Sequence, residues 1–178
     1  MVDVGTSPAI FDQKKLDYLN GFYIRKMAIG ELAKAAEPFL EKAGLADNKD
    51  KLLIALSLVQ ERLKKLSEIP AQIDFFFKPP ENLAKILVAR DSTKEKTKLA
   101  LEKSYHYLSQ EKDFGRDSLE QLLRAVAAKN NLKAGEVLWP IRVALTGKEA
   151  SPGAFEVLEA LGKEESLRRI KKAISMIE

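Results

Sequence analysis

The chain has 178 residues, of which 46% are hydrophobic and 31% are charged. This suffices for one ordinary domain, or for two small subdomains that share a core. The absence of cysteine excludes disulfides, thiolate nucleophiles and zinc–thiolate sites. The net charge of +4 and the pI near 9.1 favour an anionic partner. The apolar runs are too short to cross a bilayer, and the N-terminal residues lack the pattern of a signal peptide.

Apolar residues recur at helical spacing, and alternating runs rich in valine, isoleucine and threonine are missing. One stripe predicts a helix in the first half of the chain. Its members are Leu52, Leu56, Val59, Leu63 and Leu66. Because Leu53, Ile54 and Leu58 lie off this stripe, we expect that helix to be central and covered on more than one side. Similar patterns predict helices around residues 119–126 and 167–177, so the fold class is all-α.

Capping residues indicate where helices begin and end. Ser92 with Glu95, and Ser118 with Gln121, each fit a capping box. Ser151-Pro152 combines a capping residue with a proline suited to the first helical position. Glycine adopts the left-handed conformation at little cost and commonly ends helices. The glycines at predicted helix ends are Gly44, Gly147 and Gly162.

The dipeptide Pro79-Pro80 is the strongest internal break and follows the apolar segment Phe75-Phe76-Phe77. We interpret that segment as a buried wall between two subdomains. We therefore predict a first helical subdomain over residues 13–78 and a second over residues 79–178. Residues 1–12 are interpreted as a lead-in from a preceding domain.

Catalytic constellations are hard to assemble from these residues. The single histidine, His106, cannot by itself form a triad or a histidine-rich metal site. There is no glycine-rich phosphate loop. The carboxylates alternate with lysine and arginine in the manner of solvated helix faces. We therefore predict neither catalytic residues nor a metal site.

The stretch from Trp139 to Phe155 indicates a helix, a short turn and the start of a second helix. Arg142 follows Trp139 by three positions, so both side chains project from one helix face, while Pro140 either opens or kinks that helix. The helix start at Ser151-Pro152 offers free N–H groups to an unstacked base or a phosphate. On residue chemistry alone, core packing with an edge arginine and a capping serine explain most of this stretch.

Two sets of residues carry a family resemblance. The first is Trp139-Pro140-Ile141-Arg142-Val143-Ala144-Leu145-Thr146-Gly147, followed by Ser151-Pro152-Gly153-Ala154-Phe155. The second is Ser7-Pro8-Ala9-Ile10-Phe11-Asp12, with Lys15-Leu16-Asp17-Tyr18-Leu19-Asn20 and Tyr23-Ile24-Arg25. Both resemble the C-terminal anticodon-binding region of bacterial glutamyl-tRNA synthetases, which are class I aminoacyl-tRNA synthetases. The resemblance covers nearly the whole chain and implies a two-subdomain helical cage around the anticodon.

The resemblance also implies which residues contact the anticodon. Arg142, Ser151, Pro152 and Ala154 match a pocket that receives splayed anticodon bases, although the family often has a larger aliphatic residue in place of Ala154. Arg62 resembles an arginine that faces the last anticodon base in enzymes that accept tRNA-Glu and reject tRNA-Gln. A guanidinium donor fork suits the acceptors of cytosine but not the N–H groups of guanine. Without the resemblance, Arg62 would be a solvated helix arginine.

Further residues are candidates for contacts with the tRNA backbone or stem, and the structural alternative for each is a solvated or packing role. They are Lys15, Asn20, Tyr23, Arg25, Arg168 and Lys172.

The resemblance implies a tRNA anticodon recognition domain of a glutamate–tRNA ligase, which selects tRNA-Glu for ATP-dependent glutamylation. The complete enzyme would use ATP and magnesium, whereas this chain lacks the family's catalytic motifs and should not activate glutamate alone. We expect a cytoplasmic monomer whose partners are tRNA-Glu and the catalytic body of the same enzyme. The alternative is a helical protein-interaction module without an RNA role.

Overall fold

The computed structural model describes residues 12–45, 48–81 and 83–177, and within these ranges it contains helices and turns but no strand. The first helices are α1 (Gln13–Lys26), α2 (Ile29–Ala43), α3 (Lys49–Val59) and α4 (Ile69–Phe77), with the 3-10 turns η1 (Gln60–Arg62) and η2 (Leu66–Glu68) before α4. After η3 (Leu83–Lys85) come α5 (Lys94–Gln110), α6 (Arg116–Lys129), α7 (Ala134–Thr146), α8 (Ala154–Leu161) and α9 (Lys163–Ile174). The all-α prediction is confirmed.

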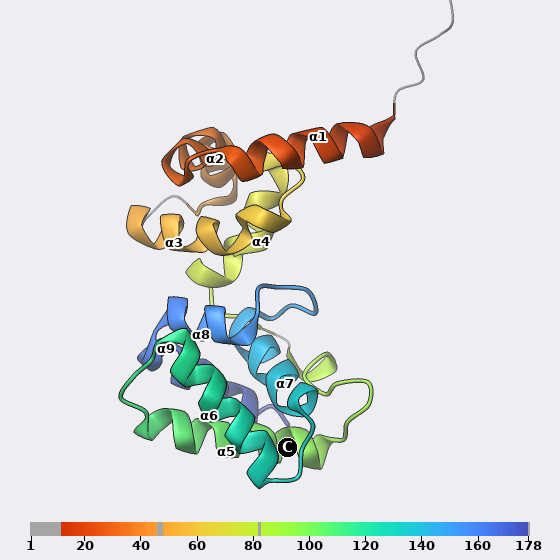
Figure 1. The fold of residues 1–178 in the computed structure, drawn as a ribbon, viewed down its shortest axis with the longest axis vertical. Coiled ribbons are helices and arrows are strands. Elements are labelled where there is room, and N and C mark those ends of the chain that lie inside the picture. The colour runs from red at the N-terminus through yellow and green to blue at the C-terminus, as the bar shows by residue number, and fades with distance from the viewer. Residues whose placement is uncertain (1–11, 46–47, 82, 178) are drawn as a thin grey trace, which may run out of the picture.

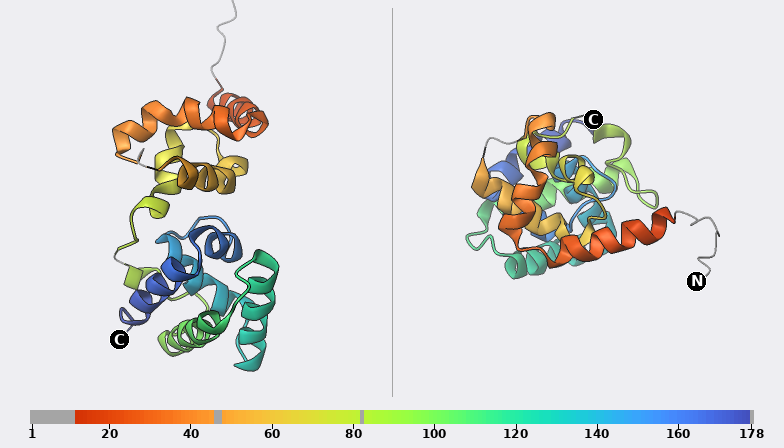
Figure 2. Two further views of the ribbon diagram at one scale, coloured as in Figure 1. Left: turned by 90° about the vertical axis from the view of Figure 1, so that its left-hand side faces the viewer. Right: turned by 90° about the horizontal axis from the view of Figure 1, so that it is seen from above.

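The helices form two groups. Figure 1 shows α1 to α4 in one half of the molecule and α5 to α9 in the other, and Figure 2 shows the same separation from the side. Packing follows this grouping, because α2 contacts α3 and α4, whereas α5 contacts α6, α7 and α9. The pairs α3–α8 and α4–α7 join the two halves. The division at residue 78 stays a prediction.

Helix α7 is the centre of the second half. It packs against α5, α6, α8 and α9, and also against α4 from the first half. Its side chains Val137, Ile141 and Leu145 are fully buried. Pro140 lies inside this helix and does not open it, so the carbonyl of Glu136, four residues earlier, receives no N–H from position 140.

The helix predicted along the Leu52–Leu66 stripe is shorter than expected. The α-helix ends at Val59, and the chain continues as η1 and then η2. At this point Gln60 Nε2 donates to the carbonyls of Ile24 and Met27 at the end of α1, at 2.9 Å each. Ile54 is 47% exposed, so the prediction that this helix is covered on several sides is wrong at that position.

The predicted N-caps are displaced from their expected positions. Helix α5 is capped by Thr93, whose Oγ1 accepts from the N–H of Lys96 at 3.3 Å, and not by Ser92. Helix α6 begins after Gly115, so Ser118 lies inside it and donates to Asp113. Helix α8 begins after Gly153, so Ser151 does not cap it either. In each case a residue nearby takes the N-cap backbone conformation.

The predicted helix ends agree better with the structure. Gly44 and Gly147 adopt left-handed backbone conformations, with φ of 66° and 69°, at the ends of α2 and α7. Gly162 ends α8. Among the described helices, none combines the length and the apolar character that a membrane crossing requires.

Candidate nucleic-acid interface

Arg142 is held at one edge of α7 by two groups, a backbone carbonyl and an aromatic ring. Its Nη2 donates to the carbonyl of Glu149 at 2.9 Å, and its guanidinium lies 5.0 Å from the centre of the Trp139 ring. The Trp139 Nε1 donates to the carbonyl of Ile86 at 2.9 Å. Arg142 is therefore a positioned cation at the border of the core, as the helical spacing predicted.

The second candidate arginine, Arg62, acts electrostatically on Arg142. Burial lowers the pKa of the Arg142 guanidinium, and the positive charge of Arg62 lowers it further. Arg62 belongs to η1 and is exposed, so its predicted place on the edge of a long helix is wrong. The two arginines lie 80 positions apart in the numbering and come from different halves of the fold. Only the packing of those halves brings their charges together.

Two of the predicted contact residues, Ser151 and Pro152, lie in the short connection between α7 and α8, and a third, Ala154, is the first residue of α8. Ser151, Pro152 and Ala154 are buried. The Ser151 hydroxyl donates to the carbonyl of Pro152 at 3.1 Å. Of the three, Ala154 lines the same cavity as Arg142, and contact between these side chains and a base stays a prediction.

The N-terminus of α8 already faces a negative charge. A Cβ added at Gly153 would meet the flexible end of the Glu156 carboxylate, which lies over this helix start. Glu156 also pairs with Arg116 of α6 at 3.1 Å. A carboxylate at a helix N-terminus is favourable, so a phosphate approaching this end would have to displace Glu156. The sequence-based expectation of open N–H groups at this helix start is therefore weakened.

A cavity of about 1320 Å³ opens beside these residues. Its walls come from residues 85–91, the first turn of α6, the outer face of α7 and the start of α8. Trp139, Phe155, Ile86 and Leu138 give it an apolar lining, with Arg142 at its edge. The volume exceeds the range of about 300–1,000 Å³ that is usual for small-molecule sites. Such a hollow has room for unstacked bases, which single-strand recognition requires.

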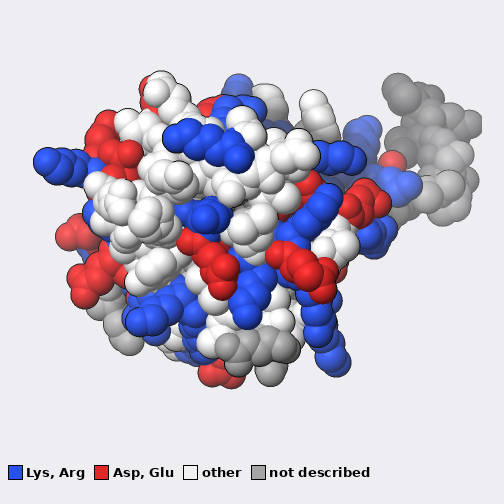
Figure 3. All heavy atoms as spheres, turned by 90° about the horizontal axis from the view of Figure 1, so that it is seen from below, with Lys and Arg blue, Asp and Glu red and all other residues white. Residues whose placement is uncertain are grey.

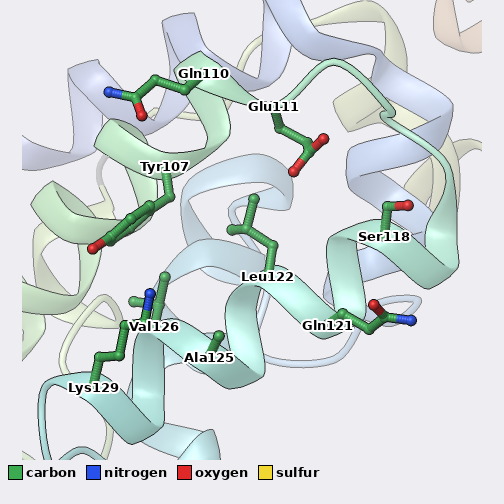
Figure 4. Close-up of a pocket in the computed structure, with 9 residues that line it drawn as sticks. All are labelled: Tyr107, Gln110, Glu111, Ser118, Gln121, Leu122, Ala125, Val126 and Lys129. Carbon is green, nitrogen blue, oxygen red and sulfur yellow. The ribbon is translucent and has the colours of Figure 1, made fainter.

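A second hollow, of about 410 Å³, lies between α5 and α6. Figure 4 shows Tyr107 on α5 and Leu122 on α6 at this gap. The ammonium of Lys129 lies 5.4 Å from the centre of the Tyr107 ring. None of the residues predicted to contact tRNA lines this hollow.

The remaining predicted contact residues do not line the cavity. Lys15 and Tyr23 are exposed on α1, and this helix packs beside η1. An added Cβ on Gly21 would stand 3.1 Å from the carbonyl of Leu63, which shows how closely α1 approaches the segment after Arg62. Asn20 and Arg25 of α1 are half-buried, whereas Arg168 and Lys172 are exposed on α9.

The surface of the second half carries no continuous basic stripe on the face drawn in Figure 3. Lysine and arginine are scattered there among acidic and uncharged side chains. Sequence-independent attraction to phosphates along that face is therefore expected to be modest.

The cluster at the start of α9 is structural. Arg169 is 3% exposed, and it donates through Nε to Glu165 at 2.6 Å and through Nη1 to the carbonyl of Leu145. Hydrogen bonds from Arg168 and Arg169 hold the pKa of Glu165 at about 2. This cluster fixes the end of α7, immediately before the connection that carries Ser151.

Sequence reasoning missed the backbone groups and the lysine that assemble the site. The carbonyls of Ile86 and Glu149 orient Trp139 and Arg142, but backbone carbonyls have no sequence signature. Lys148 contacts α4 across the two halves. In the sequence it is one surface lysine among many.

The structure is thus an all-α domain in which Arg142 lines a wide, largely apolar hollow. The comparisons identify the class, because residues 31–174 match the family described as the anticodon binding domain. The chain belongs to this family.

The similar proteins in this family are glutamate–tRNA ligases. The ligase of Clostridium kluyveri is 35% identical over 178 residues, which is 98% of this chain but 36% of that protein. The ligase of a Roseiflexus species is 38% identical over 179 residues and is matched over 35% of its length. The chain therefore spans about a third of these relatives, and the sequence-based resemblance to their anticodon-binding region is confirmed.

Solved structures support the fold. A glutamate tRNA ligase from Elizabethkingia meningosepticum, crystallised with its amino acid, aligns over 94% of this chain and 33% of its own, with a TM-score of 0.78 and 24% identity. The synthetase from Elizabethkingia anophelis aligns with a TM-score of 0.74 and 25% identity, over 93% of this chain and 32% of its own. The alternative of a protein-interaction module without an RNA role is not favoured by these findings.

Proposed function

We propose that this chain recognises the anticodon of tRNA-Glu for a glutamate–tRNA ligase, while the chemical steps take place in another part of that enzyme. Unstacked anticodon bases would enter the cavity beside Trp139, where Arg142 and the Ser151–Ala154 connection read them. Arg62 would face the last anticodon base. The observation that carries this proposal is that Arg142, held by the carbonyl of Glu149 and the ring of Trp139, lines the larger cavity, and the charge of Arg62 from the other half of the fold acts on it.

Arg62 would supply the choice between tRNA-Glu and tRNA-Gln. Its guanidinium presents donors only, so it complements the acceptors of a cytosine and opposes the N–H groups of a guanine. A well-placed base contact of this kind is worth about 1–3 kcal/mol of discrimination. Its exposure on a short 3-10 turn leaves the guanidinium accessible to a base.

Contacts outside the cavity would orient the tRNA. We place Lys15, Asn20, Tyr23 and Arg25 of α1 toward the tRNA stem and the catalytic body of the ligase. The outward side of α1 carries large apolar side chains that suit such a protein contact. They are Leu16, Tyr18, Leu19, Phe22 and Tyr23. Arg168 and Lys172 of α9 would add salt-dependent attraction to phosphates.

ATP and magnesium would serve the complete ligase. Within the described parts of the chain, no three acidic or histidine side chains come together as a metal site, and the sequence has no glycine-rich phosphate loop. The residues present here therefore do not fit these groups, and we derive no step through them. We expect the protein to work as a monomer in the cytoplasm.

The test is binding of tRNA-Glu transcripts whose third anticodon base is altered, at low and at physiological salt. The unmodified chain should bind the cognate transcript more tightly than transcripts with an altered third anticodon base. The Arg62→Gln variant should show a smaller ratio of affinities between the tRNA-Glu and tRNA-Gln anticodons. Arg124→Gln on α6 is a matched control, since it removes the same charge from a surface pair with Glu120. Equal affinity for all anticodons at both salt concentrations would refute the proposed recognition.

A further inference from the structure

Lys148 connects the two halves of the fold at the site. It follows the glycine that ends α7, and its side chain reaches α4. The Nζ donates to the carbonyl of Ala71 at 2.6 Å and pairs with Asp74 Oδ1 at 2.8 Å. The Lys148 side chain is 24% exposed and that of Asp74 is 46% exposed, so this charge-assisted contact is only partly shielded from water.

A second close contact lies one residue earlier. Gly147 has a φ of 69°, and a Cβ added there would stand 2.7 Å from the Cβ of Pro80. The end of α7 therefore rests directly on the proline segment that leaves α4. Together, Gly147 and Lys148 hold the α7–α8 connection against the first half of the fold.

Lys148 is joined to both arginines by short paths. On one side its neighbour Glu149 supplies the carbonyl that accepts from Arg142 at 2.9 Å. On the other side α4 follows η2, where the carboxylate of Glu68 accepts from the N–H of Lys64 at 3.1 Å. Lys64 lies two positions after Arg62. The Lys148 contact with α4 thus ties the segment that holds Arg142 to the helix that follows the Arg62 segment.

We infer that Lys148 is a positioning residue that fixes the spacing of Arg62 and Arg142, and thereby lets the protein read neighbouring anticodon bases in one register. This role depends on the anticodon recognition proposed above. Lys148 need not touch the tRNA, because its contacts with Ala71 and Asp74 are internal. Loss of its ammonium group should loosen the two halves and weaken discrimination at both bases together.

The contact of Lys148 with Ala71 and Asp74, which we call the clamp, can be tested without tRNA. The chain has no cysteine, so spin labels can be attached at Glu37→Cys on α2 and Glu102→Cys on α5, both exposed positions. The distribution of distances between the labels should broaden in Lys148→Met and return to its original width in Lys148→Arg. Lys103→Met, an exposed α5 position with the same change of charge, should leave the distribution unchanged. An unchanged distribution in Lys148→Met would overturn the clamp.

The effect on recognition is measured with the same transcripts. Lys148→Met should reduce the preference for the cognate anticodon by about three- to tenfold, while Lys103→Met should not. Arg62→Gln should have a smaller effect in the Lys148→Met background than alone, because coupled sites are non-additive. If Lys148→Met is too unstable to measure, Asp74→Asn weakens the same contact from the other side.

The outcomes separate the two proposals. A wild-type chain that binds all anticodons equally would remove the proposed function, whatever the label distances show. A wild-type preference that survives in Lys148→Met and Asp74→Asn would remove the positioning role and leave the proposed function intact.

Discussion

Replacing Glu165 by glutamine should destabilise the protein near neutral pH and have much less effect in acid. The Glu165 carboxylate accepts from Arg169 Nε at 2.6 Å. Arg169 is 3% exposed and also donates to the carbonyl of Leu145 at the end of α7. Glutamine at position 165 would leave this buried guanidinium without its compensating charge. Helix α9 would then hold the end of α7 less firmly.

The magnitude follows from the pKa of Glu165. Hydrogen bonds from Arg168 and then Arg169 hold this pKa at about 2, against an ordinary value of 4.5. A displacement of this size corresponds to about 3 kcal/mol of folding free energy. Because the Glu165 side chain is 30% exposed, water screens part of the interaction, and we expect about 2 kcal/mol.

The sign of the pH dependence follows from the direction of the shift. A carboxyl group whose pKa is lowered by folding stabilises the protein fully above its pKa in the unfolded chain. That contribution disappears as the pH falls from about 4.5 toward about 2. The difference in stability between the wild type and Glu165→Gln should therefore shrink over this interval.

Urea denaturation of both proteins near pH 7 and about pH 3 measures this difference. Glu120→Gln is the matched control, because Glu120 pairs with Arg124 at 2.6 Å on the surface of α6. This pair should be worth less than about 0.5 kcal/mol. A loss for Glu165→Gln no larger than that of the control near pH 7, or a loss that is the same at both pH values, would refute the reasoning.

Three further outcomes are expected. Gly147→Ala should cost about 1–3 kcal/mol in urea denaturation, because φ is 69° and the new Cβ would meet Pro80; a neutral result would contradict the close contact. Arg142→Lys should lower anticodon discrimination by about 1–3 kcal/mol. Because the charge remains, the salt dependence of tRNA binding should not change. An altered salt dependence with intact discrimination would indicate a phosphate contact instead. Leu101→Ala, at a fully buried position, should cost about 2–5 kcal/mol in the same denaturation assay. Ile54→Ala, at a position 47% exposed, should cost much less.

Much of the local structure can be predicted from the sequence. Helical spacing and the absence of alternating runs are enough to predict an all-α chain, because side-chain period reflects backbone geometry directly. Gly44 and Gly147 are predictable helix ends, since few other residues adopt the left-handed conformation. Arg142 is recognisable as a border residue from its spacing to Trp139. The family resemblance is carried by runs such as Pro140–Gly147, where the order of residues is itself the signal.

Other local features depend on contacts made elsewhere. The α-helix after Lys49 ends at Val59, and the side chain of Gln60 bonds there to carbonyls at the end of α1; no sequence pattern near Gln60 predicts this contact. Ser92 and Thr93 are both plausible caps, and only the backbone path at the start of α5 selects Thr93. Competing local signals of similar strength are decided by tertiary packing, which is worth more than a single cap.

The sequence by itself determined that this protein is helical, lacks thiol chemistry and carries arginines suited to reading a base. It also identified the family, because the matching runs span both ends of the chain. Only the tertiary structure decided that the charge of Arg62 acts on Arg142, that Ile86 and Glu149 hold the Trp139–Arg142 pair, and that Lys148 bridges to α4. These relations join residues separated by tens of positions, and backbone carbonyls take part in several of them. Their free energy comes from burial and charge in the assembled fold, which no local pattern encodes.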